Sequence, residues 1–160
     1  MRIHFLTTGG TIDKVYFDAK SEFEVGPPQV KDILKESNVS FDYDVESVLA
    51  KDSLELTDAD RELIRARVAA APCERIVITH GTDTMAQTAK VLKSIPEKTV
   101  VLTGSMQPAR FKNTDAVFNL GTAIAAVQTL PHGVYIAMNG RVFNPDQVRK
   151  DRAQGKFVQE

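Results

Sequence analysis

Two short polar loops hold the residues best suited to chemistry. Thr8-Gly9-Gly10-Thr11 and Thr79-His80-Gly81-Thr82-Asp83-Thr84 each follow an apolar run. A pair of glycines lets the backbone turn sharply and approach a ligand, which leaves the Thr11 hydroxyl just beyond the turn. In the second loop a hydroxyl and a carboxylate stand side by side at a predicted helix start, where backbone N–H groups favour a bound anion. A tight turn, and helix capping by Thr82 or Asp83, explain the same residues without a ligand, so neither loop alone indicates a binding site.

Several other chemistries lack the residues that they need. The sequence has no Gly-x-Gly-x-x-Gly and no Gly-Lys-Thr, which disfavours nucleotide binding. His4, His80 and His132 are the only histidines, they are not in ligand spacing, and no cysteine cluster accompanies them. Ser105, in Gly104-Ser105-Met106-Gln107, is not in a nucleophile elbow, and a Ser-His-Asp triad is disfavoured as well. We therefore expect no metal and no cofactor.

Alternating strands and helices must position the two loops. Apolar runs predict buried strands at 3–8, 75–79, 99–103 and 133–138. Helices are predicted from the N-cap Thr57 to about 71, after Thr84 to about 95, and at 116–130 with Thr114 or Asp115 as the cap. A short helix after Pro27-Pro28, a one-faced strand near the sheet edge around 41–46, and a loop or small hairpin at 11–26 complete the pattern. The tail after Val148 is polar and is expected to be partly mobile.

Continuous apolar strands separated by helices predict an α/β fold, with a mostly parallel sheet covered by helices on both faces in three layers, α/β/α. Ligands in such folds bind beyond the carboxyl ends of the strands. The loops at 8–11, 80–84 and 104–106 all follow predicted strands at that edge. We therefore expect the three loops to converge on one rim.

Composition and charge narrow the class further. With 160 residues, of which 42% are hydrophobic and 26% charged, the chain is expected to form one domain. A formal charge of -1 without long runs of one sign argues against binding to nucleic acid or a membrane surface. Cys73 is the only cysteine, which fits a reducing cytoplasm, and no apolar stretch has the length of a signal peptide or a membrane span.

Four motifs carry a resemblance to a known family. Residues 8–12 (Thr-Gly-Gly-Thr-Ile), 79–85, 102–108 (Leu-Thr-Gly-Ser-Met-Gln-Pro) and 115–120 occur in the order and rough spacing of bacterial-type asparaginases, and the likeness continues through 133–150. The chain resembles the N-terminal, catalytic-residue-bearing domain of the L-asparaginase family. The resemblance implies that family's fold and an amidohydrolase that acts through a threonine nucleophile on asparagine or a related small amide.

The resemblance also implies roles for the residues that match the motifs. Thr11 corresponds to the nucleophile and Thr82 to the second catalytic threonine, while Asp83 corresponds to the residue that binds the substrate's amino group. Lys150 falls where the family keeps the lysine that pairs with the last two. A threonine hydroxyl must shed its proton as it attacks, and a lysine kept partly dry beside a carboxylate can take or relay that proton. The plainer alternative is that Lys150 is a solvated charge in the run 149–152.

Four more residues complete the implied site. Ser53 looks like the serine that binds the substrate's α-carboxylate, and Tyr16 is a candidate for the lid tyrosine, although it lies closer to Thr11 in sequence than that tyrosine usually does. Backbone N–H groups around Gly10 and Gly81 are candidates to bind the substrate and hold a developing oxyanion.

Two departures from the family pattern affect the expected activity. Leu54 stands where the family usually has a polar residue. The chain is also about half the usual family length, so residues 1–160 are expected to form a single domain without the C-terminal domain, which lends an acidic residue to a neighbour's active site. The alternative to an active enzyme is a weak or inactive module that binds small amino acids. An uncovered site also predicts a homodimer or a dimer of dimers.

Overall fold

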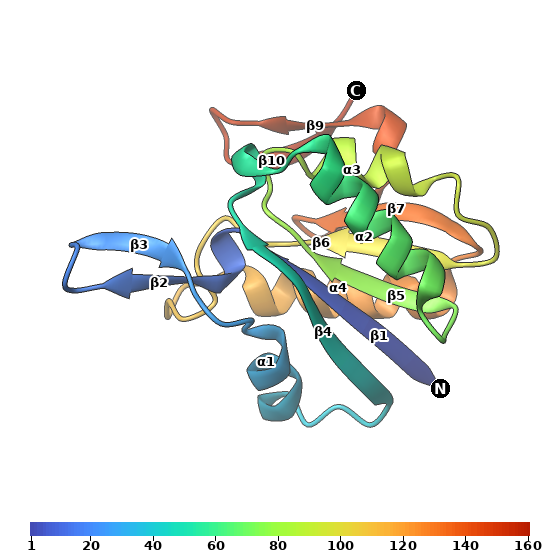
Figure 1. The fold of residues 1–160 in the computed structure, drawn as a ribbon, viewed down its shortest axis with the longest axis horizontal. Coiled ribbons are helices and arrows are strands. Elements are labelled where there is room, and N and C mark those ends of the chain that lie inside the picture. The colour runs from blue at the N-terminus through green and yellow to red at the C-terminus, as the bar shows by residue number, and fades with distance from the viewer.

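A central, mostly parallel sheet organises the chain. The computed structural model describes residues 1–160, and its six-stranded sheet has the order β4-β1-β5-β6-β7-β8. All neighbouring strands are parallel except β7 and β8, which pair antiparallel. Helices α2 and α3 cover one face of the sheet, and α4 lies on the other (Figure 1). The predicted three-layer α/β/α fold is confirmed.

The elements follow the predicted order closely. The six strands of the sheet are β1 (Arg2–Gly9), β4 (Asp42–Lys51), β5 (Arg75–Thr79), β6 (Thr99–Thr103), β7 (Gly133–Met138) and β8 (Arg141–Phe143). The helices are α1 (Val30–Glu36), α2 (Asp58–Ala70), α3 (Met85–Leu92) and α4 (Ala116–Thr129). Two hairpins stand apart from the sheet, β2 (Lys14–Phe17) with β3 (Glu22–Val25), and β9 (Val148–Asp151) with β10 (Lys156–Gln159).

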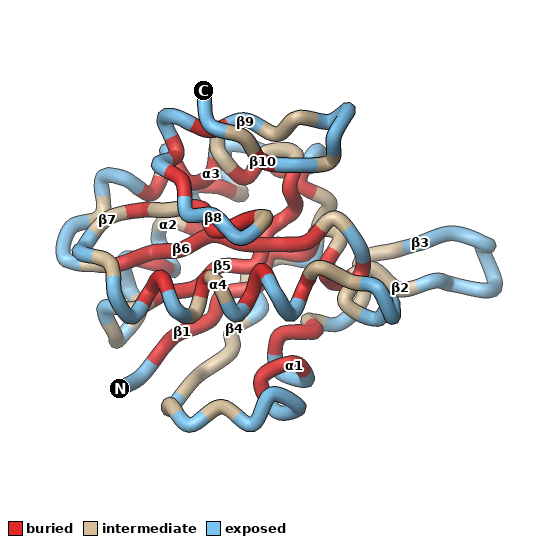
Figure 2. The backbone as a smooth tube through the Cα atoms, turned by 180° about the vertical axis from the view of Figure 1, so that it is seen from behind, coloured by how far each residue is buried: buried red, intermediate tan, exposed pale blue.

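Alternate residues of the buried strands build two cores, one on each face of the sheet. Ile76 and Ile78 of β5 pack in the layer of α2 and α3, whereas Val77 between them packs in the layer of α1 and α4. This is the period of two that a strand imposes on its side chains, and both faces are apolar because both are covered. The central strands are buried along almost their whole length, while the β2–β3 hairpin is mostly exposed (Figure 2).

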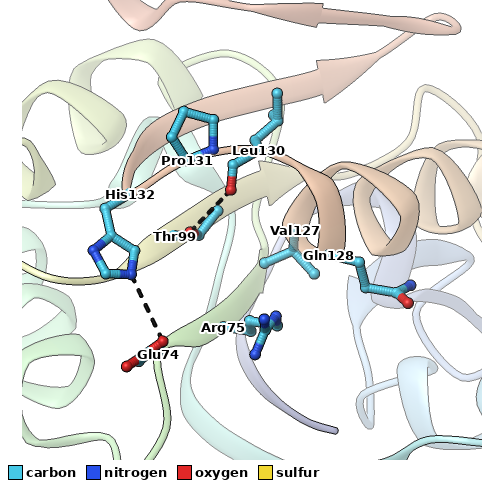
Figure 3. Close-up of a pocket in the computed structure, with 8 residues that line it drawn as sticks. All are labelled: Glu74, Arg75, Thr99, Val127, Gln128, Leu130, Pro131 and His132. Atoms are coloured by element: carbon cyan, nitrogen blue, oxygen red, sulfur yellow. Dashed lines mark hydrogen bonds and ion pairs between the residues drawn. The ribbon is translucent and has the colours of Figure 1, made fainter.

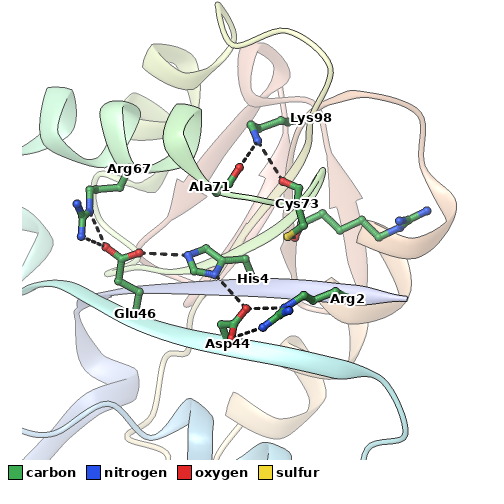
Figure 4. A network of polar contacts seen from close by, with 9 residues as sticks. Arg2, His4, Asp44, Glu46, Arg67, Ala71, Cys73 and Lys98 are labelled. Atoms are coloured by element: carbon green, nitrogen blue, oxygen red, sulfur yellow. Dashed lines mark hydrogen bonds and ion pairs between the residues drawn. The ribbon is translucent and has the colours of Figure 1, made fainter.

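The edge strand β4 is joined to its neighbours by a polar network rather than by apolar packing alone. Arg2 of β1 forms a bidentate ion pair with Asp44, with both N···O distances 2.7 Å. His4 Nε2 lies 3.2 Å from a carboxylate oxygen of Glu46, whose other oxygen accepts from Arg67 of α2 (Figure 4). Charges along an exposed edge also discourage pairing with another chain, so we regard this network as structural.

Two expectations about local structure were wrong. The tail after Val148 is not mobile but forms the β9–β10 hairpin, anchored in the core by Val148 and Phe157. Neither Thr82 nor Asp83 caps α3, because this helix starts at Met85 with Thr84 in the capping position and without a side-chain capping bond. By contrast Thr57 caps α2 as expected, in a reciprocal capping box with Asp60. No helix of this fold combines the length and apolar character that crossing a bilayer requires.

Candidate active site

Three loops meet at the carboxyl edge of the sheet through glycine contacts. Gly10 has φ 84°, a conformation that side chains other than glycine rarely adopt, and a Cβ there would lie 2.5 Å from the Cα of Gly81. A Cβ on Gly81 would in turn lie 2.6 Å from the Cβ of Ser53. Gly10 therefore touches Gly81 backbone to backbone, Gly81 lies against the side chain of Ser53, and only glycine at both positions allows this packing of the loops after β1, β4 and β5. This gives the two glycines a packing reason beside their predicted ligand-binding role.

A lysine joins the two polar residues of the second loop. Lys150 Nζ lies 2.7 Å from Thr82 Oγ1 and 3.0 Å from Asp83 Oδ1. Its side chain is only 19% exposed, and it stands opposite the buried Phe157 in the β9–β10 hairpin. The expectation of a solvated charge is therefore wrong. These three residues come from segments 67 and 68 positions apart, and the folded tail brings them together.

The histidine of the second loop is buried and hydrogen-bonded within the protein, so its role is structural. His80 is fully buried, its Nδ1 is 2.6 Å from the carbonyl oxygen of Gly81, and its Nε2 is 2.8 Å from Thr88 Oγ1. Burial lowers the pKa of His80 to about 4, with the charge of Arg61 acting in the same direction and the bond to Gly81 opposing it. The ring is therefore neutral at physiological pH and fixes the shape of the loop that presents Thr82 and Asp83.

Ser53 places an unpartnered hydroxyl against this loop. Its Oγ is buried and has no hydrogen-bond partner, while its backbone carbonyl accepts from Thr84 Oγ1 at 2.8 Å. A buried polar atom without a partner is uncommon in folded proteins and calls for a ligand or a strained contact. Leu54, beside it, is exposed.

Thr11 lies at the start of a short 3₁₀ turn, residues 11–13, directly after Gly10. The contact of Gly10 with Gly81 brings this turn to the edge that carries Thr82, although no hydrogen bond joins Thr11 to the Thr82, Asp83 and Lys150 cluster. Tyr16 is not brought to that cluster. It is 52% exposed on β2, packs against Phe23 with ring centroids 5.3 Å apart, and belongs to a hairpin that projects away from the sheet (Figure 1).

One titratable residue near Thr11 escaped the sequence analysis. Asp13 is only 1% exposed, and its Oδ1 accepts from the backbone N–H of Gln29 at 2.9 Å. Burial raises the pKa of Asp13 from 3.8 to about 7, and the Gln29 N–H pulls it back only in part. The carboxyl therefore ties the turn that carries Thr11 to the segment leading into α1.

A second carboxylate supports the loop after β6. Asp115 accepts from the backbone N–H groups of Met106 and Gln107 at 2.9–3.1 Å, instead of capping α4 with its side chain. Asn119 reaches back from α4 to the carbonyl of Gly104 at 2.9 Å. The loop after β6 is therefore held in place by α4, the helix that follows it.

The surface pockets of the molecule do not coincide with the polar cluster. A cavity of about 300 Å³ lies at the opposite edge, among the starts of β5 and β6, the end of α4 and His132, and it contains no hydroxyl–lysine–carboxylate set (Figure 3). Another of about 330 Å³ lies beside Lys14 and Asp52. None of the five cavities is lined by Thr11, Thr82 or Lys150, and the Lys150 and Asp83 side chains are 19% and 24% exposed, so the candidate site is a partly open rim. No set of three or more His, Cys, Asp or Glu side chains gathers in metal-binding geometry.

The three-layer sheet and the polar cluster beyond its strand ends define an α/β domain with an open site at the sheet edge. The sequence profile described as Asparaginase, N-terminal, matches residues 2–156. The chain belongs to the asparaginase family.

Individual relatives agree in sequence and in fold. L-asparaginase of Thermococcus kodakarensis is 32% identical over 167 residues, covering 97% of this chain and 49% of that protein. L-asparaginase 2 of Escherichia coli is 34% identical, covering 92% of this chain and 46% of that protein. The solved structure of the T. kodakarensis enzyme superimposes with a TM-score of 0.88 at 30% identity over 99% of this chain and 51% of its own. The chain thus spans about half the length of the curated relatives that it matches.

Proposed function

We propose that residues 1–160 act as a single asparaginase N-terminal-like domain that hydrolyses the side-chain amide of asparagine or a related small amide. The observation that carries this proposal is the position of Lys150, whose ammonium group bonds both the Thr82 hydroxyl and the Asp83 carboxylate. This arrangement provides a hydroxyl, a base or proton relay and an anchoring carboxylate within hydrogen-bonding distance. The asparaginase names of the relatives agree with it.

The proposed reaction uses two steps at one threonine. Thr11 Oγ attacks the amide carbon, its proton passes by way of Thr82 and Lys150 to the leaving nitrogen, and ammonia departs from an acyl-enzyme. Water then attacks the ester, releases the carboxylic acid and returns the proton to Thr11. Backbone N–H groups near Gly10 and Gly81 remain the candidates to stabilise the oxyanion, although the N–H of Gly10 itself donates to the carbonyl oxygen of Lys51 at 3.0 Å.

The substrate's backbone would be held at two points. The buried, unpartnered hydroxyl of Ser53 suits a carboxylate, and Asp83 suits a cationic or hydrogen-bonding group. An open rim with few enclosed contacts predicts weak binding of asparagine, with a Michaelis constant in the millimolar range, about 4 kcal/mol of binding free energy. Glutamine is expected to be poorer, because its longer side chain carries the amide past Thr11.

The second candidate is a catalytically weak or inactive module that binds a small amino acid. The open rim favours it, because water at the site weakens each electrostatic interaction there. A second copy of the chain would cover the rim, and we therefore propose a homodimer or a dimer of dimers. A single, partly exposed cysteine fits a reducing cytoplasm as its setting.

Ammonia release from asparagine, glutamine and a panel of small amides tests the proposal, with Thr11→Ala as the matched control. Release that depends on Thr11 supports the hydrolase. Binding of aspartate, measured by calorimetry, without release from any amide would favour the binding module. Equal release by the wild type and Thr11→Ala would refute a threonine nucleophile at this position.

A further inference from the structure

The carboxylate proposed to hold the substrate's amino group already contacts two cations. Asp83 Oδ1 lies 3.0 Å from Lys150 Nζ and 3.4 Å from a guanidinium nitrogen of Arg152. Both cations belong to the β9–β10 hairpin, Lys150 on β9 and Arg152 in the turn that follows it. One negative and two positive charges leave this cluster with a net charge of +1.

The neighbouring carboxylates Asp52 and Asp151 offset the excess only in part, since each has a cation of its own, although Asp52 also interacts electrostatically with Lys150. Asp52 lies 3.0 Å from Lys14 Nζ and accepts from the backbone N–H of Leu54. Asp151 accepts from two backbone N–H groups of the hairpin turn, and its other oxygen lies 3.9 Å from Arg149. Each of these acids already has cationic or N–H partners of its own, so the second cation at Asp83 has no acidic partner besides Asp83.

A ligand that enters this site meets both cations beside Asp83. An α-ammonium group placed against Asp83 would have to displace Arg152 or lie beside two like charges, which lowers affinity. A carboxylate at the Ser53 end is attracted by the same excess of positive charge. The site is therefore better suited to a ligand with a carboxylate and no ammonium group.

We propose that this chain prefers small carboxylated amides without an α-ammonium group, such as succinamate, over asparagine, and that Arg152 determines this preference. The proposal rests on the hydrolase function proposed above and narrows its substrate class. The chemistry is unchanged: the amide C–N bond breaks, ammonia leaves, water supplies the oxygen of the new carboxylate, and succinate is the product. The preference itself is a matter of binding, so it does not depend on turnover.

Two ligands that differ only in the ammonium group isolate the effect. Calorimetry with the full chain should show succinate binding at least threefold more tightly than L-aspartate at low ionic strength. Arg152→Ala should reduce that ratio by about two- to fivefold, the scale of an exposed charge, since the Arg152 side chain is 70% exposed. The ratio should also shrink at about 0.5 M salt, because an exposed charge is screened.

Arg149→Ala is the matched control. It removes an exposed arginine from the same hairpin, one that contacts Asp151 and not Asp83. The succinate-to-aspartate ratio should therefore stay at the wild-type value. Equal shifts in the two variants would show a general effect of net charge and would overturn the role of Arg152. Wild-type binding of aspartate as tight as that of succinate, or binding of neither, would overturn the preference itself.

Ammonia release then separates this inference from the proposed function. Faster release from succinamate than from asparagine, with the ratio reduced in Arg152→Ala, supports both. Faster release from asparagine supports the hydrolase and refutes the preference. Preferential succinate binding without release from any amide supports the preference and refutes the hydrolase.

Discussion

Replacing Asp13 by asparagine should stabilise the protein above neutral pH and have no effect in acid. The carboxyl is 1% exposed, and burial raises its pKa from 3.8 to about 7. A carboxyl whose pKa is raised in the folded state stabilises the fold fully below pH 3.8, and this contribution is lost as the pH rises to about 7. At 1.36 kcal/mol per pH unit, the loss amounts to about 4 kcal/mol. Asparagine has the same shape, carries no charge and keeps an acceptor for the Gln29 N–H.

His80 gives the free energy of unfolding the opposite pH dependence, and this conceals the pH dependence that comes from Asp13. Its pKa is lowered to about 4 from 6.5, mainly by burial, so the imidazole stays neutral in the fold while the unfolded chain takes up a proton. The stability associated with His80 is therefore complete above pH 6.5 and is lost as the pH falls towards 4, by about 3 kcal/mol. Between pH 4 and 6.5 the two contributions nearly cancel. We expect the stability of Asp13→Asn to rise across this window more steeply than that of the wild type.

Urea denaturation followed by circular dichroism between pH 4 and pH 8 provides the measurement. The variant should be more stable than the wild type by about 2–4 kcal/mol at pH 8, which corresponds to about 5–15 °C in the melting temperature of a chain this size, and equal to it at pH 4. Asp18→Asn, in the exposed turn of the β2–β3 hairpin, controls for loss of a charge near the same loop. A destabilised Asp13→Asn at pH 8 would refute the reasoning, because it would mean that the fold stabilises the ionised carboxylate and does not raise the pKa of Asp13.

Three further outcomes follow from the site. Gly10→Ala should lose at least about 2 kcal/mol of stability in urea denaturation, because its Cβ would lie 2.5 Å from backbone atoms. Gly121→Ala, with open space around it in α4, should gain about 0.5–1 kcal/mol. A tolerated Gly10→Ala would contradict the close packing of the loops. Thr82→Val and Lys150→Gln should each reduce ammonia release at least about a hundredfold, with melting temperatures near that of the wild type. Lys156→Gln, on the same hairpin, should leave the rate of release unchanged. Near-normal rates in the first two variants would exclude the proposed proton path. Light scattering at micromolar concentration should show a dimer or tetramer, and a fully active monomer would contradict the proposed covering of the site by a second copy.

Sequence patterns predicted the sheet because the central strands are apolar on both faces. Residues 76–78 and 100–102 are apolar on both faces, which only a strand covered by helices tolerates, and the structure places them in the middle of the sheet. The β9–β10 hairpin was missed for the opposite reason. It has only Val148 and Phe157 in the core, and ten largely polar residues around them give no clear period.

The candidate site was predictable where chemistry and backbone geometry coincide. Gly10 and Gly81 are needed for close packing of the loops, and the hydroxyls of Thr11 and Thr82 follow them directly. A single Gly-Thr motif therefore indicates both the loop contact and the candidate catalytic hydroxyl. Asp13 was not predictable, because its perturbed pKa comes from burial beneath a segment 16 residues away. Desolvation is a property of the assembled fold, and no local pattern records it.

The glycine-packed loops and the β9–β10 hairpin each form one part of the site, and they are positioned by different interactions. Substitutions at the glycine contacts of the loops are therefore expected to disturb the fold, whereas exposed positions of the hairpin can change without disturbing it. The loops after β1, β4 and β5 touch through Gly10, Gly81 and the Ser53 backbone, and buried groups such as His80 hold them, so a substitution there disturbs the fold. The charges that face a ligand come instead from one hairpin anchored by two apolar side chains, where Arg152 is largely exposed and contributes nothing to the core. A change at that position alters the charge beside Asp83 without altering any loop. In the proposed function the hairpin therefore has two roles, since Lys150 takes part in the proton path together with the glycine-packed loops, whereas Arg152 bears only on the choice of ligand.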